Sequence, residues 1–342
     1  MQSHSPLRIL ITGGTGFIGK RIARHLLNAG LFQLEGEAPR EIAKIILFDA
    51  FPGEDVPTDA RIEVRIGDID DRETVAEITR DVDLVWHLAA VVSSAAEADF
   101  DLGMQVNLYG LLNLLEALRA RTTRTRLVYA SGFAVFGGEL PSVVTDATAP
   151  TPKSSYGMQK AIGELLVADY SRRGFIDGRT LRLPTITVRP GKPNKAASTF
   201  VSSIIREPLN GHRAVCPVRP DTIVYISSPR RALDAMLHAM YLDDATIGAE
   251  RTLPLPGLTV SVAGMVESLA RAGGVAATGL IDWVPDAQVQ RIVESWPTHV
   301  EAARASALGF HADPDFDAIV QAHIEDEAVP VLRTADPRGV RE

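Results

Sequence analysis

A tyrosine and a lysine four residues apart, Tyr156 and Lys160, form the pair of side chains in this sequence best suited to acid–base chemistry. The residues from Ser154 to about Arg173 follow a helical pattern, with Ser154 or Ser155 as its expected cap. Residues at i and i+4 share one helix face, so the Lys160 ammonium can lie beside the Tyr156 phenol. The ammonium would stabilise the phenolate and lower a pKa that is otherwise about 10. Such a phenol can act as a general base toward a hydroxyl group.

A glycine-rich stretch near the N-terminus gives this pair a context. Thr12-Gly13-Gly14-Thr15-Gly16-Phe17-Ile18-Gly19 follows an apolar run and precedes a helical pattern, and its glycines are spaced G-x-x-G-x-x-G. Without side chains at Gly13 and Gly16 the backbone can turn sharply and approach a pyrophosphate, which the helix N-terminus attracts. Gly19 lets the helix pack closely on a sheet. This stretch predicts a dinucleotide site with contacts from Gly13, Thr15, Gly16, Phe17, Ile18 and Gly19.

An aspartate at the end of the next long strand favours NAD as the dinucleotide. Lys44 to Phe48 form an apolar strand that ends in Asp49. A carboxylate there can accept both ribose hydroxyls of the adenosine and would repel the extra phosphate of NADP. No arginine directly follows to receive that phosphate. The alternative is an ordinary surface aspartate at a strand end.

Other predicted cofactor contacts lie where later strands end. Small residues after His87 would let the cofactor lie across the carboxyl edge of the sheet, whereas His87 itself is interpreted as structural. Asp68 follows the third strand, where a side chain can reach the adenine, and a solvated turn is nearly as good an interpretation. The complete set adds Asp68, Ile69, Leu88, Ala89, Ala90, Asn107, Tyr156, Lys160 and Pro184 to the glycine loop and Asp49.

The alternation of short apolar strands and amphipathic helices predicts an α/β fold, a doubly wound parallel Rossmann sheet with a smaller C-terminal substrate-binding domain. We expect the NAD-binding domain over residues 7–189, with later segments returning to it. Residues 190–326 are expected to be mainly substrate-binding, and 327–342 a tail. Strands are predicted at 7–11, 44–48, 61–66, 84–88, 126–130 and 179–183, and helices at 103–119, 154–173, 199–205, 229–241 and 260–272.

Composition excludes several classes of function. The formal net charge of −8 is unfavourable for general binding to nucleic acid or to an anionic membrane. The single cysteine, Cys216, excludes an internal disulfide framework, and no Cys/His cluster has the spacing of a metal site. No apolar run is long enough to span a bilayer, and no signal pattern begins the chain. We therefore expect a cytoplasmic enzyme with a small-molecule substrate and no metal.

Taken together, the glycine loop, His87-Leu88-Ala89-Ala90, Asn107 and the Tyr156–Lys160 segment resemble the extended short-chain dehydrogenase/reductase family. The resemblance implies an NAD-dependent enzyme with Tyr156 and Lys160 as catalytic residues. Residues 91–103 and 182–194 are similar to a branch whose members oxidise the C2 hydroxyl of a four-carbon sugar acid to the 2-oxo acid. Family members often dimerise through the long helices, and the leucines within 103–119 are compatible with a homodimer.

One position departs from the family pattern. In the family a serine or threonine polarises the substrate oxygen, five residues before the glycine of a V-Y/F-G turn. That turn is Val135-Phe136-Gly137 here, so the position is Gly132. Its neighbour Ser131 is the candidate catalytic and substrate-binding replacement, although successive strand residues point to opposite faces. Ser93 or a water molecule are the alternatives.

A sugar-acid substrate also requires a group that binds its carboxylate. Arginine suits a carboxylate because its guanidinium can donate two parallel hydrogen bonds. Candidate substrate-binding residues are Ser93, Ser131, Tyr156, Arg189, Lys192 and Asn194, with Arg230 or Arg231 as further cations. The competing functions are a nucleotide-sugar epimerase, a dehydrogenase for another hydroxy acid or amino alcohol, and a non-catalytic NAD-sensing protein.

Overall fold

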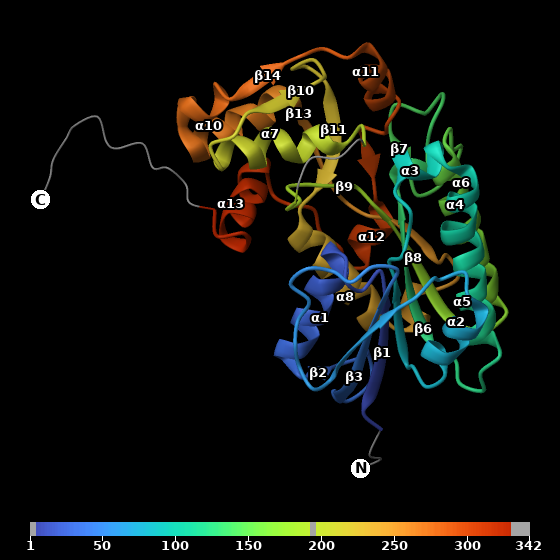
Figure 1. The fold of residues 1–342 in the computed structure, drawn as a ribbon. Helices are drawn as coiled ribbons and strands as arrows, with labels where there is room; N and C mark the ends of the chain where they lie inside the picture. The colour runs from blue at the N-terminus through green and yellow to red at the C-terminus, as the bar shows by residue number, and fades with distance from the viewer. Residues whose placement is uncertain (1–4, 192–195, 330–342) are drawn as a thin grey trace, which may run out of the picture.

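A computed structural model describes residues 5–191 and 196–329 of the chain (Figure 1). Its centre is an eight-stranded sheet in the order β12-β8-β6-β5-β1-β3-β2, with β4 also pairing with β3. All neighbouring pairs are parallel except β2–β3. The strands are β1 (Leu7–Thr12), β2 (Leu31–Phe32), β3 (Arg40–Asp49), β4 (Ile62–Ile66), β5 (Leu84–His87), β6 (Arg126–Gly132), β8 (Asp177–Leu183) and β12 (Thr252–Pro254).

Helices cover both faces of this sheet, which confirms the predicted doubly wound α/β architecture. Helices α1 (Phe17–Ala29) and α8 (Pro229–Tyr241) pack together on one face over a core that includes Ile9 and Ile11. Helices α2 (Arg72–Thr79), α5 (Gly110–Arg119) and α6 (Ser155–Arg172) cover the other face, where Leu10 lies. The strand order runs in opposite directions on the two sides of β1. In such sheets a crevice for ligands forms at the carboxyl ends of the strands beside this point.

The helix predicted over 103–119 is divided in the structure. A short helix α3 (Ser93–Ala98) is followed by α4 (Phe100–Gly103), a π-helical turn η1 (Met104–Tyr109) and then α5. The wider turn carries Asn107, and π-helical turns frequently occur at functional sites. A leucine pattern at helical spacing does not distinguish i→i+4 from i→i+5 hydrogen bonding, so the sequence could not show this change.

The C-terminal segment forms most of a second layer of structure above the carboxyl edge of the sheet (Figure 1). It has its own apolar core, in which Phe200, Ile204 and Met265 are buried, and Cys216 also lies there. Its helices are α7 (Thr199–Leu209), α10 (Val262–Thr278), α11 (Ala287–Glu294) and α13 (Phe316–Asp326), whereas α9 (Asp244–Ile247) and α12 (Ala303–Ala307) contribute to the core of the large sheet. Its strands form three small sheets: β9 (Thr185–Ile186), β11 (Ile223–Ser227) and β13 (Leu258–Ser261); β10 (Ala214–Cys216) with β14 (Ile281–Trp283); and β7 (Val144–Thr145) with β15 (Val300–Glu301).

The chain crosses between these two layers more than once. After β9 and α7 it returns as α8 and β12, which join the large sheet, and then leaves again as β13 and α10. The indole N–H of the buried Trp86 on β5 donates a hydrogen bond to the carbonyl of Met236 on α8, 3.0 Å away. The face of the sheet that carries α1 is therefore completed by residues from beyond position 190.

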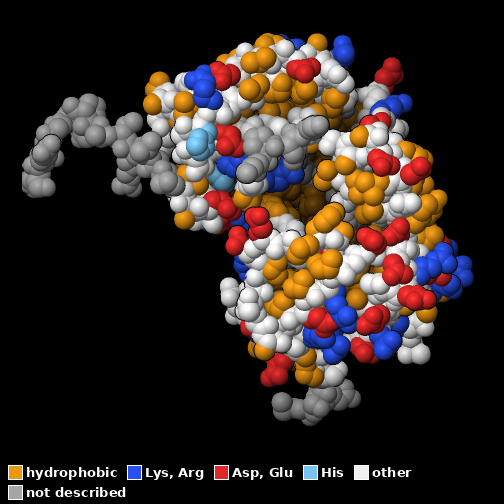
Figure 2. Space-filling model, viewed as in Figure 1, with side chains coloured by type: hydrophobic (Ala, Val, Ile, Leu, Met, Phe, Trp, Pro, Cys, Tyr) orange, Lys and Arg blue, Asp and Glu red, His pale blue; other side chains and the backbone are white. Residues whose placement is uncertain are grey.

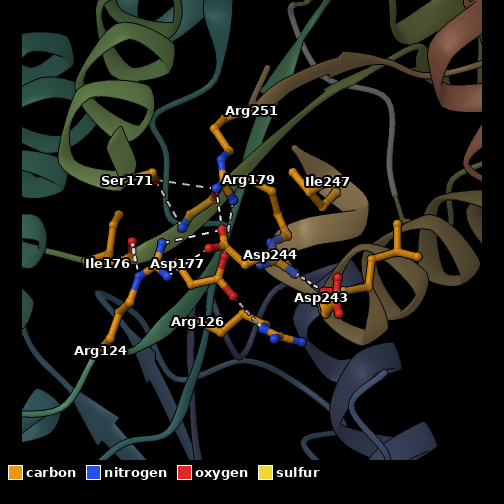
Figure 3. A network of polar contacts seen from close by, with 12 residues as sticks. Arg124, Arg126, Ser171, Ile176, Asp177, Arg179, Asp243, Asp244, Ile247 and Arg251 are labelled. Atoms are coloured by element: carbon orange, nitrogen blue, oxygen red, sulfur yellow. Dashed lines mark hydrogen bonds and ion pairs between the residues drawn. The ribbon is translucent and has the colours of Figure 1, made fainter. Parts of the chain in front are cut away.

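A network of arginines fastens α8 to the sheet at the amino ends of β6 and β8 (Figure 3). Arg179 is fully buried and donates to the carbonyls of Ala239 and Leu242, at 2.7 and 2.6 Å, near the C-terminus of α8. Arg126 donates to the carbonyl of Met240 at 3.0 Å. Cations are favourable at this end of a helix. Asp177 balances the charge by accepting from both arginines.

Several predicted elements differ at their ends. Strand β3 begins at Arg40 instead of Lys44, α7 continues to Leu209, and α10 begins at Val262 because Leu258–Ser261 pairs with β11 as β13. The predicted helix over 229–241 is confirmed as α8, and Ser154 caps α6 as expected. Pro208 lies inside α7, near its end, so a proline did not end this helix where the sequence predicted.

Candidate active site

The molecule is hollowed between the carboxyl edge of the large sheet and the C-terminal layer, and Lys or Arg side chains gather beside this hollow (Figure 2). The glycine loop between β1 and α1 lies at this edge of the sheet. The start of α6, with Tyr156, follows the carboxyl end of β6 in the same region, because Gly157 packs against the carbonyl of Ala134. The fold thus brings the two strongest sequence signals to one edge of the sheet.

The glycine loop has the geometry that a pyrophosphate requires. Gly13 adopts a φ of 67°, and a Cβ atom there would lie 2.8 Å from the backbone nitrogen of Ala89. Gly16 is the N-cap of α1, and no side chain caps the helix or places a negative charge in its first turn. The first N–H groups of α1 can therefore bind an anion. A Cβ at Gly19 would lie 2.5 Å from the carbonyl oxygen of Gly13, so this glycine serves close packing. These residues fit a dinucleotide.

The side chains predicted to contact the adenosine differ in their exposure and in their hydrogen bonds. Asp49 ends β3 next to the loop, where its Oδ2 accepts a hydrogen bond of 3.2 Å from the backbone nitrogen of Thr15. The Thr15 hydroxyl donates to the carbonyl of Phe51 at 2.9 Å. Asp68 is exposed at the carboxyl end of β4. The Ile69 side chain is buried in the core against Gly110, so only its backbone is left for a cofactor.

His87 is structural, as the sequence suggested. Its Nδ1 lies 2.7 Å from the hydroxyl oxygen of Thr12, which also accepts a hydrogen bond of 3.3 Å from the backbone nitrogen of Ala89. Burial, together with the charge of Lys160, lowers the pKa of His87 to about 3. A neutral imidazole hydrogen-bonded to the Thr12 hydroxyl therefore helps to hold the Leu88–Ala90 segment against the glycine loop.

Tyr156 and Lys160 lie on the same side of α6, one turn apart. The Ser154 hydroxyl oxygen caps the helix by accepting from the backbone nitrogen of Gly157 at 3.1 Å. Lys160 is 2% exposed, and its Nζ donates to the carbonyl of Ala130 at 2.8 Å. That nitrogen lies 5.6 Å from the centre of the Tyr156 ring. The pair therefore has the relative placement that the spacing predicted.

The protonation of this pair differs from the prediction. Burial raises the pKa of Tyr156 to about 12, and the charge of Arg189 acts in the opposite direction. Burial lowers the pKa of Lys160 to about 8, and the charge of Glu164 opposes that change. The expectation that Lys160 lowers the pKa of Tyr156 is therefore wrong for this structure. The spacing of two residues reports their proximity and not their desolvation, which here has the larger effect.

Ser131 faces a buried carboxylate. Its hydroxyl donates to Oε1 of Glu164 at 2.6 Å, and Glu164 also forms an ion pair with Arg182, with Oε2 2.7 Å from Nη2. Sequence reasoning missed Glu164, although it lies one further turn along α6 from Lys160. The structure leaves the role of Ser131 toward a substrate as a prediction.

Asn107 forms hydrogen bonds with the backbone of the loop that follows β5. Its Oδ1 accepts from the backbone nitrogen of Val91 at 2.8 Å, and its Nδ2 donates to the carbonyl of Val91 and to Oε1 of Gln159. Gln159 is fully buried and was also missed, since a residue inside a Y-x-x-x-K segment gives no signal of its own. Asn107 thus positions a loop that follows the predicted cofactor-binding alanines.

The predicted substrate-binding residues differ in their surroundings. Among the described residues, the guanidinium of Arg189 has no hydrogen bond or ion pair with another side chain, and its pKa is lowered mainly by burial. Ser93 is exposed at the start of α3. Pro184, a predicted cofactor contact, is buried between β8 and β9. Lys192 and Asn194 lie outside the described residues. Arg230 and Arg231 are already paired, with Asp326 and Asp234 respectively.

The described part of the chain contains no cluster of three or more His, Cys, Asp or Glu side chains that could hold a metal ion. Within the same residues, no helix has the length and apolar character needed to cross a membrane.

Comparison with known proteins gives the class of protein that this fold and site define. Residues 9–232 match the NAD dependent epimerase/dehydratase family, and the chain belongs to that family. The resemblance to extended short-chain dehydrogenases/reductases is thereby confirmed.

Individual relatives narrow this class further. The chain is 50% identical to the D-erythronate dehydrogenase of Cupriavidus necator over 94% of its own length and 98% of that protein. It is 41% identical to the D-erythronate dehydrogenase of Haemophilus influenzae, with 93% and 99% covered. A nucleoside-diphosphate-sugar epimerase structure from Agrobacterium tumefaciens superimposes with a TM-score of 0.89 at 39% identity, covering 96% of both chains. L-threonine 3-dehydrogenase from Trypanosoma brucei shares the fold, with a TM-score of 0.82 at 23% identity.

The protein is accordingly an NAD-dependent dehydrogenase that acts on a CH–OH group. The curated relatives cover nearly the whole chain and therefore support dehydrogenation of a sugar acid. The predictions of the enzyme class, of NAD and of the Rossmann fold are confirmed.

Proposed function

We propose that this enzyme oxidises the C2 hydroxyl of D-erythronate, or of a closely similar four-carbon sugar acid, to the 2-oxo acid. The observation that carries this proposal is the 50% identity to a D-erythronate dehydrogenase across both layers of the fold. A match confined to residues 7–189, which we take as the NAD-binding domain, would support only the cofactor. A match over 94% of the chain also covers most of residues 190–326, which we take as mainly substrate-binding.

The proposed reaction uses Tyr156 as the general base. Bound NAD supplies the acceptor for the hydride that leaves C2. The Tyr156 phenolate takes the proton of the C2 hydroxyl, so that the C–O single bond becomes a carbonyl. Lys160 holds its ammonium beside the phenol and is the proposed contact to the ribose. A protein that holds the hydride donor and acceptor in a fixed arrangement would gain much of its rate from this positioning.

Arg189 is the proposed anchor for the substrate carboxylate. Its charge acts on the Tyr156 phenol, and a half-buried guanidinium without a carboxylate partner among the described residues can bind an anion strongly. A carboxylate on C1 held by Arg189 would place the adjacent C2 hydroxyl toward Tyr156. Ser93, Lys192 and Asn194 remain proposed contacts to the rest of the substrate.

The test is a screen for NADH formation with four- and five-carbon aldonic acids of both stereochemical series. We expect D-erythronate to be among the best substrates, and Tyr156→Phe to lose most turnover while it still binds NAD. NAD reduction by none of these acids would contradict the proposed substrate. Near-normal turnover of the Tyr156→Phe variant would contradict the proposed base.

An epimerase is the second candidate, because a structure described as a nucleoside-diphosphate-sugar epimerase is 39% identical over 96% of the chain. An epimerase returns its hydride to the substrate and accumulates no NADH. Incubation with nucleotide sugars, followed by analysis of the sugar and of the cofactor, separates the two functions.

We also propose a homodimer. Four large apolar side chains are exposed on the adjacent elements α4, η1 and α6: Phe100, Leu102, Tyr109 and Leu165 are between 40% and 72% exposed. Covering such a patch removes apolar surface from water. A monomer by sedimentation would contradict this proposal, and Leu165→Glu should dissociate the dimer.

A further inference from the structure

Helix α6 carries a third ionisable side chain in line with the proposed catalytic pair. Tyr156, Lys160 and Glu164 follow one another at intervals of four residues and therefore share a face of the helix. Glu164 is 3% exposed. A buried carboxylate requires partners, and here both of its oxygen atoms have them.

The partners of Glu164 come from two neighbouring strands. Ser131 on β6 and Arg182 on β8 are register partners, so their side chains leave the sheet on the same side. The Ser131 hydroxyl donates to Oε1 at 2.6 Å, and Arg182 donates from Nε to Oε1 at 3.0 Å and from Nη2 to Oε2 at 2.7 Å. A hydroxyl has one hydrogen to donate. Ser131 cannot give that hydrogen to Glu164 and to a substrate oxygen at the same time.

Within residues 5–191 and 196–329, one negatively charged group acts on the Lys160 ammonium. From the sheet, the Tyr129 ring lies 4.8 Å from Nζ and the neutral His87 is nearby. Arg182 forms an ion pair with Glu164, and Tyr156 lies one turn back along α6, within the influence of Arg189. Of the described ionisable groups that act on this ammonium, Glu164 alone is a carboxylic acid, and its negative charge favours the charged form of Lys160.

We propose that Glu164 is a positioning residue that holds Lys160 charged and in place beside Tyr156, and that Ser131 acts on Glu164 instead of on the substrate. The proposal rests on the proposed dehydrogenase function of Tyr156 and Lys160. It assigns Ser131, Glu164 and Arg182 to one buried support behind the reacting groups. The donor to the substrate oxygen must then be another group, since Gly132 has no side chain.

The first test is Ser131→Ala, which removes one hydroxyl and no charge. Removal of a hydrogen-bond donor from a developing oxyanion lowers kcat by about 10²- to 10³-fold. We expect Ser131→Ala to lower kcat by less than about 10-fold, with KM nearly unchanged, because the carboxylate keeps Arg182. A loss of 10²-fold or more in a folded variant that still binds NAD would overturn the proposal.

The second test measures the lysine directly and needs no substrate. The few lysines of the chain can be labelled isotopically and titrated by NMR, with Lys160 assigned through a Lys160→Arg variant. In Glu164→Gln we expect the pKa of Lys160 to fall by about 1 unit or more from its parental value, because an opposite charge nearby changes a pKa by this amount. The alkaline limb of the kcat profile should move to lower pH by the same amount.

Asp177→Asn is the matched control for this titration. It also removes a buried carboxylate that pairs with an arginine on β8, but at the amino end of the strand (Figure 3). We expect it to lower stability and to leave the titration of Lys160 unchanged. An unchanged Lys160 titration in Glu164→Gln, or an equal change in Asp177→Asn, would overturn the proposal. If Glu164→Gln does not fold, the Ser131→Ala kinetics still decide. If no aldonic acid is oxidised, the proposed function fails while the titration remains a valid test.

Discussion

Replacing Arg189 with glutamine tests the proposed substrate anchor most directly. The guanidinium has no side-chain partner among the described residues, so its loss leaves no buried carboxylate unpaired. The backbone carbonyl of Arg189 still accepts from Arg206, and its N–H still donates to Ser202. We therefore expect the variant to fold with a thermal midpoint close to that of the parent.

The expected effect is on the binding of the acid. Hydrogen bonds to charged groups contribute about 1.5–3 kcal/mol, and 1.4 kcal/mol corresponds to a factor of ten. The KM for the sugar acid should therefore rise about 10- to 150-fold, while the dissociation constant of NAD, measured separately by fluorescence, stays the same.

The same variant should change the pH dependence. The charge of Arg189 lowers the pKa of Tyr156, against the increase caused by burial. Without it the phenolate is less favourable, so the acidic limb of kcat/KM should move to higher pH. Arg189→Lys keeps the charge but not the bidentate geometry, and should raise KM without moving that limb. Arg230→Gln, at a paired surface arginine, is the control. A KM for Arg189→Gln within about twofold of the parental value would refute the assignment.

Three further predictions concern stability and the cofactor. Gly132→Ser should fold normally, because the backbone there is extended and a Cβ would meet one carbonyl oxygen, at 3.5 Å. Thermal unfolding checks this expectation. A kcat below the parental value would argue against space for a hydroxyl donor at this position. Gly13→Ala should weaken NAD binding and lower stability by more than the roughly 1–2 kcal/mol cost of a positive φ, because a Cβ would also lie 2.8 Å from the backbone nitrogen of Ala89. Calorimetry should show both losses, and an alanine variant with parental stability and NAD affinity would contradict this prediction. The pKa of the buried His323 is lowered from 6.5 to about 4, so the unfolded chain binds more protons between these values. Stability should fall by about 3 kcal/mol as the pH decreases from 6.5 to 4, and His323→Leu should reduce that slope in urea titrations.

Elements that have a signal within a short stretch of sequence could be predicted. The glycine loop with its flanking strand and helix, α8, and the Ser154 cap all have local signals that the structure reproduces. The family could be named because several such signals occur in one order.

Contacts between distant residues could not be predicted in this way. The bond of Ser131 to Glu164 depends on the register of β6 with β8 and on the rotation of α6, and neither has a local signal. The raised pKa of Tyr156 results from burial, which the i and i+4 spacing does not report. The π-helical turn around Asn107 is hidden for a similar reason, since the leucine pattern continues on both sides of it.

The return of the chain to the large sheet as α8 and β12 affects how enzymes of this type can change their substrates. Cutting the chain at residue 190 would remove the hydrogen-bond partner of Trp86 on α8 and the edge strand β12. The first half of the chain is therefore not expected to fold by itself. Exchanging whole C-terminal halves between relatives would therefore disturb the nucleotide fold. A chimaera should instead receive the stretches 196–227 and 258–301 separately and keep α8 and β12 of the recipient. Such an exchange leaves the large sheet and its covering helix intact.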